Sequence, residues 1–228
     1  MSVFFRRRGK ASVLDDIFAN NSWEAIIAAC QSGSVPDSWV VGNSKTMAIN
    51  GADYQIDIIG KNHDTYTAGG TAPLTFQMHD CYGETKNMNS SHTNAGGWTS
   101  CAMRSTHLPA ILALMPTEVQ NGIREVNKLT SAGSQSGTKN TTADKLFLLS
   151  EIEIFGSTTH SKRGEGSQYD YYKAGNSKVK KYNGSAGVWW ERSPYGNNST
   201  NFCFVSINGN AGYGGAGSAY GVAFGFCF

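Results

Sequence analysis

A chain of 228 residues with 39% hydrophobic and 11% aromatic residues can bury a sizeable core, as one large domain or two small ones. Only 16% of the residues are charged, against ~25% in typical soluble domains, which excludes disorder driven by charge. The net charge of +2 gives no reason to expect a nucleic acid as partner. The 27 glycines and five prolines favour turn-rich structure with strands over a helical bundle.

The N-terminal residues differ from the rest in character. A very short apolar stretch precedes the basic run at residues 6–10, which is the reverse of a secretory signal. No apolar run approaches the ~20 residues of a membrane span, so we expect no membrane insertion and synthesis in the cytoplasm without a signal peptide. Residues 1–20 are predicted to form an attachment or oligomerisation arm, with a solvated basic arm as the alternative, and residues 21–228 to form the domain.

The first half of the chain predicts one helix and several strands. Ser22 or Asn21 can cap a helix, and Gly33 ends it. Asn50 and Gly51 form a hairpin turn between two strand-like runs. The strands predicted here are residues 39–41, 45–49, 54–60 and 74–79.

The second half begins with a long polar loop pinned by Trp98, followed by a helix over 105–114 with Pro109 near its start. Residues 131–143 are predicted to be a flexible surface excursion. The strands predicted in this half are residues 145–150, 188–194, 201–208 and 222–228. The expected fold is α+β, with two main helices, short antiparallel strands and long ordered loops.

Several motifs that carry chemistry elsewhere find no support. The glycines at 212, 214 and 217 match a dinucleotide fingerprint, but no helix or acidic residue follows. His63-Asp64 and His79-Asp80 are adjacent pairs, which on a strand point to opposite faces, so ordinary hydrogen-bonded histidines are expected, with a composite metal site including His92 as the alternative.

Cysteine and charge placement predict structural roles. The five cysteines, at 30, 81, 101, 203 and 227, contain no C-x-x-C pair, so most are expected to be buried free thiols. Cys203 with Cys227 is the first pair to test for a bridge. Arg192 is predicted to form a buried ion pair, and Glu151 or Glu153 can partner either Arg192 or Arg104.

The C-terminal segment has an unusual composition. Residues 193–228 contain no Asp, Glu, Lys, Arg or His and consist mainly of Gly, Asn, Ser, Ala, Tyr and Phe. Antibody binding loops use a similar mixture, because Tyr gives contact area at low entropic cost while Ser, Gly and Asn adapt their hydrogen bonds. Aromatic-rich stretches at 188–194 and 221–228 bracket this segment, which indicates strands and loops fixed at both ends.

A series of short blocks spans residue 22 to the C-terminus. They are Trp23-Glu24-x-Ile26, Val41-Gly42-Asn43-x-Lys45, His63-Asp64, Met88-Asn89, Gly96-Gly97-Trp98-x-Ser100, Met103-Arg104, residues 146–150 with Glu153, Glu165-Gly166-x-Gln168-Tyr169-x-Tyr171-Tyr172, residues 189–194, Phe202-Cys203, Gly221-Val222 and Gly225-Phe226-Cys227. In this order the blocks resemble the C-type-lectin-like variable proteins that are targets of diversity-generating retroelements in bacteria and phages.

The resemblance implies a variable region at about 189–228. In that family the variable codons resemble AAC with adenines replaced at random, which cannot encode Lys, Glu, Gln, Met or Trp. All five are absent from residues 193–228. The scaffold residues implied are Trp189, Trp190, Phe202, Cys203, Val222 and Phe226. The ligand-binding face implied is Tyr195, Gly196, Asn197, Asn198, Thr200, Phe204, Ser206, Ile207, Gly212, Tyr213, Gly214, Gly215, Gly217, Ser218 and Tyr220.

The function implied is non-enzymatic binding of a protein or glycan on a target cell, without cofactor or catalytic residue. The setting implied is a phage tail or bacterial cell surface, with other virion proteins as neighbours and a possible homotrimer for avidity. Two alternatives remain open, a formylglycine-oxidase-like enzyme and a purely structural virion protein. The Glu-Pro-Asn site of calcium-dependent lectins is absent, and the closely spaced cysteine pair of the oxidases is not matched.

Overall fold

The structure, a computed structural model, describes residues 13–228, so the part of the predicted arm at residues 1–12 lies outside the described residues. A short 3-10 helix η1 (Phe18–Asn20) precedes α1 (Trp23–Ser32). The Ser22 side chain accepts a hydrogen bond from the Ala25 N–H, and Gly33 ends α1 with φ 69°, as predicted. Phe18 is 2% exposed and packs edge-on against Trp39, so residues before 21 already belong to the core.

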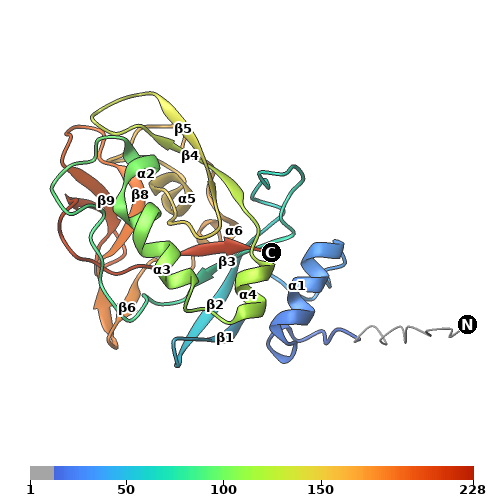
Figure 1. Cartoon of the computed structure of the whole chain (residues 1–228). Coiled ribbons are helices and arrows are strands. Elements are labelled where there is room, and N and C mark those ends of the chain that lie inside the picture. Colours follow the sequence, from blue (N-terminus) through green and yellow to red (C-terminus); the bar gives the residue numbers. More distant parts are fainter. Residues whose placement is uncertain (1–12) are drawn as a thin grey trace, which may run out of the picture.

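The largest sheet joins both halves of the chain. It contains β1 (Ser44–Ile49), β2 (Ala52–Lys61), β3 (Leu74–Met78) and β11 (Gly225–Cys227) in the order β1-β2-β3-β11, with every pair antiparallel. Asn50 and Gly51 have φ of 51° and 76°, the left-handed pair that a two-residue hairpin requires, which confirms the predicted turn. Figure 1 shows β11, in red, crossing the centre of the molecule beside β3.

The predicted helix over 105–114 starts earlier and has two parts. A π-helical turn η2 (Met103–His107) leads into α3 (Leu108–Leu112), and the Leu108 N–H donates to the Met103 carbonyl. Pro109 has no N–H to donate to the preceding turn, which is the physical reason for the wider turn before it. The helices α2 (Gly97–Ser100) and α4 (Thr117–Gly122) flank this pair, and α4 packs against α1 (Figure 1).

The middle of the chain contains more regular structure than predicted. Part of the expected excursion at 131–143 is the hairpin of β4 (Val126–Ser131) and β5 (Lys139–Asp144). Next come α5 (Glu151–Phe155) and α6 (Asp170–Lys173), then the short hairpin of β6 (Lys180–Tyr182) and β7 (Ser185–Gly187).

Two predicted strands are wrong. Residues 39–41 form a loop in which the Val40 N–H donates to Asn43 Oδ1 at 2.9 Å, while Trp39 is fully buried. Residues 146–150 are buried, but among the described residues the only ladder contact of the 145–150 run is a bridge from Phe147 to Gly225. The Leu148 carbonyl accepts a hydrogen bond from the Arg192 guanidinium, and the Leu149 carbonyl accepts one from the Arg192 backbone N–H, so no continuous ladder forms along this run.

The C-terminal segment forms a second sheet before it joins the first. β8 (Trp189–Pro194), β9 (Asn201–Val205) and β10 (Ala211–Gly215) run antiparallel in the order β10-β9-β8. Figure 1 shows this sheet at the end of the molecule away from α1. The architecture is therefore a mixed α+β fold of short helices and short antiparallel strands in small sheets. Within residues 13–228 no helix has the length and apolar character needed to cross a bilayer.

A buried ion pair attaches β8 to the body of the domain. Arg192 is 0% exposed and pairs with Glu153, which confirms the predicted buried pair and selects its partner. The same guanidinium donates from Nε to Thr130 Oγ1 at 2.9 Å, from Nη1 to the Leu148 carbonyl at 2.9 Å and from Nη2 to the Glu165 carbonyl at 2.9 Å. All the donors of this side chain are directed at segments outside the C-terminal sheet.

The carboxylate of Glu153 is shared with a second buried cation. Lys128 Nζ lies 3.4 Å from Glu153 Oε1, pairs with Asp64 and donates to the Tyr169 hydroxyl at 2.7 Å. Burial raises the pKa of Glu153, but the positive charges of Arg192 and Lys128 lower it by more, so the pKa lies below its ordinary value. Glu153 therefore stays ionised inside the core.

Removing one partner of this pair leaves an uncompensated buried charge. We expect Arg192→Met to lower the free energy of unfolding by about 3–5 kcal/mol in denaturant titration. Arg163→Met, at an exposed arginine, is the matched control and should stay within about 0.5 kcal/mol of wild type. A loss for Arg192→Met no larger than the control would show that the ion pair does not hold β8.

Candidate functional site

The side chains predicted to be scaffold are all inside the molecule. Trp189, Trp190, Phe202, Cys203, Val222 and Phe226 are each 0% exposed. The indole N–H groups of the two tryptophans donate to the Lys178 and Lys86 carbonyls at 3.0 and 2.8 Å, so both rings are fixed at their polar ends as well. The C-terminal segment is thus attached at both ends, as its composition predicted.

One group of rings, which we call the Trp190 cluster, consists of Trp190, Phe204 and Tyr220. Tyr220 lies 4.7 Å from Trp190 and 5.4 Å from Phe204 between ring centroids. These rings lie over the glycines of β10, because a Cβ added at Gly212 would be 2.4 Å from the Phe204 ring. Any larger residue at 212 requires the ring at 204 to move, so the two positions are physically coupled.

A second group of rings, which we call the stack cluster, consists of Tyr195, Tyr213 and His160. The two tyrosine rings are parallel within 8° at 3.9 Å, and His160 lies edge-on 5.1 Å from Tyr213. Tyr213 is 43% exposed. Phe204 pairs with Gly212 and Tyr213 with Cys203, so by strand alternation the two clusters project from opposite faces of the sheet.

The predicted binding residues therefore do not share a single face, and they differ in exposure. Gly196 is a correction to the predicted set, because it is buried with its N–H donating to the His160 carbonyl at 2.8 Å. The exposed members are Asn197, Thr200, Ile207 and Tyr213. The half-buried members are Tyr195, Asn198, Phe204, Ser206, Gly212, Gly214, Gly215, Gly217, Ser218 and Tyr220.

Two buried polar side chains hold the loops that carry the stack cluster. The sequence assigned no role to Asn94, and Glu151 pairs with neither Arg192 nor Arg104, whose partners are Glu153 and Asp144. Asn94 donates from Nδ2 to the carbonyls of residues 195, 198 and 201 at 3.4, 3.0 and 2.7 Å. Its Oδ1 accepts from the Ser134 N–H at 2.7 Å. The Glu151 carboxylate accepts from the backbone N–H groups of residues 159, 160 and 161, the closest at 2.7 Å. Asn94 lies in a polar loop and Glu151 begins α5, but no spacing rule identifies their distant partners.

Glu191, beside Arg192 on β8, is buried without a hydrogen-bond partner for its carboxylate among the described residues. It is 0% exposed. Burial raises its pKa well above the ordinary value, Glu151 and Glu165 raise the pKa further, and Arg192 opposes them. We therefore expect the neutral acid form of Glu191 in the folded protein.

The comparisons with known proteins give one match. A family model described as a domain of unknown function, DUF6273, matches residues 65–227. The chain belongs to the DUF6273 family. No curated protein and no solved structure matches it. The region matched by DUF6273 includes β8, β9 and β10, and with them both aromatic clusters and the loops that Asn94 and Glu151 hold.

The histidines considered for a metal site in the DUF6273 chain have other partners. His79 Nδ1 lies 2.7 Å from Asp57, and this hydrogen bond raises the pKa of His79. His63 stacks on Tyr169 at 4.0 Å, and His92 Nδ1 accepts from the Gly217 N–H at 3.3 Å. Among residues 13–228, no three His, Cys, Asp or Glu side chains come together in a way that would hold a metal ion.

The cysteines of the DUF6273 chain are buried free thiols, as predicted for most of them. Cys203 and Cys227 are not bridged to each other. Burial raises the pKa of both thiols well above the ordinary value, which suppresses the thiolate form that cysteine chemistry requires.

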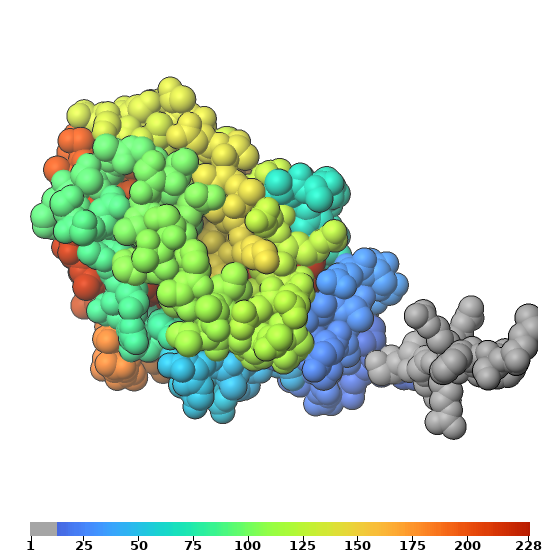
Figure 2. Space-filling view, viewed as in Figure 1, coloured from blue at the N-terminus to red at the C-terminus, as the bar shows by residue number. Residues whose placement is uncertain are grey.

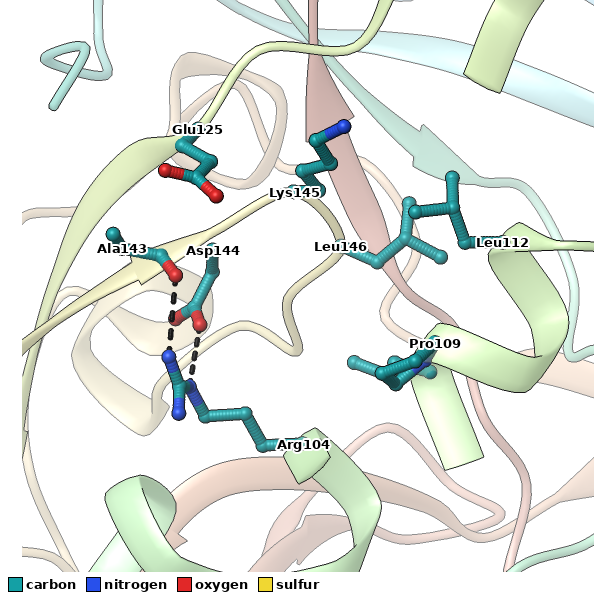
Figure 3. A pocket seen from close by; sticks show the side chains of 9 residues that line it. Arg104, Pro109, Leu112, Glu125, Ala143, Asp144, Lys145 and Leu146 are labelled. Carbon is teal, nitrogen blue, oxygen red and sulfur yellow. Dashed lines mark hydrogen bonds and ion pairs between the residues drawn. The ribbon is translucent and has the colours of Figure 1, made fainter. Parts of the chain in front are cut away.

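A pocket of about 230 Å³ lies between α3 and the β4–β5 hairpin. Figure 3 shows an apolar wall with Pro109 and Leu112 facing a charged wall where Arg104 bonds to Asp144 and to the Ala143 carbonyl. Arg104 is thus occupied by an internal ion pair at 2.5 Å. No residue of the predicted binding face lines this pocket, so it is separate from both aromatic clusters.

Loss of the Asn94 amide should loosen the loop at 195–201 without unfolding the protein. We expect Asn94→Ala to cost about 1–3 kcal/mol, because it leaves buried carbonyls without donors. Amide hydrogen exchange should accelerate in this loop, and the exposed Asn208→Ala serves as control. Unchanged exchange in Asn94→Ala would contradict the assigned role.

The pH dependence of stability should report Glu191. Its pKa is raised on folding, so its contribution is complete below the unfolded pKa of about 4.3 and is lost as pH rises through the folded pKa. The stability of Glu191→Gln relative to wild type should therefore increase from pH 4 to pH 8 in denaturant titrations. Glu125→Gln, at an exposed site, should show no such trend, and a flat difference for Glu191→Gln would show that the acid is ionised when folded.

Proposed function

We propose that this protein is a non-enzymatic ligand-binding protein that presents a diversified C-terminal surface to a protein or glycan on a target cell. The observation that carries the proposal is the arrangement of the C-terminal sheet. Buried tryptophans and the Arg192–Glu153 pair hold it, while Tyr195, Tyr213 and Ile207 reach its surface. Aromatic side chains on a rigid base are the usual energetic anchors of an interface.

The composition of the segment supports diversification. Lys, Glu, Gln, Met and Trp are absent from residues 193–228, as the codons of a diversity-generating retroelement require. Residues that cannot vary without damaging the core, such as Phe202 and Val205, are 0% exposed and adjoin half-buried positions. Tolerance and constraint therefore alternate along the segment.

We further propose that the fold is C-type-lectin-like. The support is that β11 returns to pair with β3 of the first sheet, and that a separate small sheet, β8 to β10, precedes this return. Long irregular connections link these strands, as the resemblance leads one to expect. The proposed setting is a phage tail or bacterial cell surface, in which a homotrimer would add avidity.

Sequencing the coding region across a natural population tests the proposal. We expect substitutions concentrated at codons for residues 195–220 and at adenines, with Trp189, Trp190 and Phe202 unchanged. Because Phe204 lies over Gly212, we also expect large residues at 212 only where 204 is small. An invariant segment, or substitutions spread evenly over anchors and surface, would contradict diversification and favour a structural virion protein.

A further inference from the structure

The stack cluster lies beside basic side chains, and their charge indicates the chemical class of its ligand. We propose that the stack cluster and a basic rim of Lys139, Lys162 and Arg163 together bind an acidic glycan. The tyrosine rings would contact a sugar face, and the cations would pair with carboxylate, phosphate or sulfate groups. This inference rests on the proposed function, because it assigns a ligand class to the same surface.

The charged side chains that reach solvent around the stack cluster are basic, whereas the Glu151 carboxylate that accepts from the N–H groups of 159–161 is 0% exposed. The segments in question are residues 87–104, 131–144, 156–168 and 193–220, and their only acidic residues are Asp144 and Glu165. Both are buried, at 4% and 0% exposure, and each accepts hydrogen bonds from neighbouring groups. Lys139 and Lys162 are half-buried and Arg163 is exposed. The whole chain carries a net charge of only +2, so this concentration is local.

Lys162 of the basic rim is in direct contact with the loop that carries the stack cluster. The Lys162 side chain lies across Gly196, where an added Cβ would be 3.2 Å from Lys162 Cε. The neighbouring His160 belongs to the stack cluster, and its carbonyl accepts the Gly196 N–H at 2.8 Å. Lys139 lies next along the same surface, since its Cε is 3.7 Å from a Cβ placed at Gly164.

The rim cations are free to act on a ligand. None of Lys139, Lys162 and Arg163 forms an ion pair with the described residues. Lys139 Nζ makes a hydrogen bond of 3.0 Å to the Gly137 carbonyl, which leaves its charge uncompensated. Figure 2 shows the C-terminal segment, in red, emerging at the edge of the molecule beside the green segment near residue 90 and below the yellow β4–β5 region.

The neutral side chains nearby favour a glycan over a nucleic acid. Asn197, Ser199 and Thr200 are exposed next to Tyr195 and provide donors and acceptors suited to sugar hydroxyls. Affinity for a nucleic acid backbone grows with the number of phosphates neutralised, and three rim cations fall short of the roughly 6–10 phosphate contacts of a strongly salt-dependent binder. Carbohydrate rings pack on aromatic faces, and an acidic group adds a charge-assisted bond to Lys or Arg.

The test is calorimetric titration of the full chain with tetragalacturonate and with its fully methyl-esterified, neutral form. A heparin tetrasaccharide and the oligonucleotide dT12 are the other probes. We expect at least one acidic glycan to bind about tenfold or more tightly than the neutral ester at low salt, with the difference shrinking in 0.5 M NaCl. The K162A/R163A variant should abolish this preference, and Tyr213→Ser should weaken the binding of acidic and neutral forms alike.

Lys173→Ala, an exposed lysine outside these segments, is the matched control and should bind as wild type does. Acidic glycans that bind no better than the ester, or an unaffected K162A/R163A variant, would overturn the inference, as would tighter binding of dT12. Adhesion to natural target cells that depends on Tyr213 but not on Lys162 or Arg163 would support the proposed function and reject the acidic-glycan inference. Loss of both adhesion and glycan binding would reject the two together.

Discussion

The buried Arg192–Glu153 ion pair is the constraint on which the rest of this structure depends. Arg192 stands in the last charged position of the sequence, directly before a segment without any charged residue. Its guanidinium reaches β4 through Thr130, the 145–150 segment through Leu148, and α5 through Glu153. One side chain therefore fixes β8 to three separate parts of the domain. Loss of the Arg192–Glu153 ion pair would release the sheet that carries both aromatic clusters.

A surface that varies needs a backbone that does not depend on the residues displayed. Here the backbone of the displayed loops is held mainly from outside. Asn94 binds carbonyls at 195–201, and Glu151 binds N–H groups at 159–161. The exception is β10, where the rings of Phe204 and Tyr220 lie on Gly212 and Gly214. Packing limits variation at these two glycines, whereas Ile207 is 50% exposed and leaves more room for variation.

The sequence predicted features that depend on local chemistry. The cap of α1, the Asn50-Gly51 hairpin, the buried tryptophans and the burial of Arg192 all follow from residue types and short spacings. The errors share a cause, which is dependence on distant partners. Residues 145–150 have strand composition, but two of their carbonyls accept hydrogen bonds from the side chain and the backbone N–H of Arg192. His160 and Asn94 join the candidate surface only through the fold, and strand register alone separates Phe204 from Tyr213.

The most direct measurement compares two libraries for the fraction of folded molecules, scored by protease resistance. One library randomises Asn197, Thr200, Ile207 and Tyr213 with the AAC-derived codons, and the other applies the same codons to Trp190, Arg192, Phe202 and Val222. If the C-terminal surface rests on a buried, invariant base, most members of the first library will be folded and most members of the second will not. Equal folded fractions in the two libraries would contradict the separation between displayed and supporting residues.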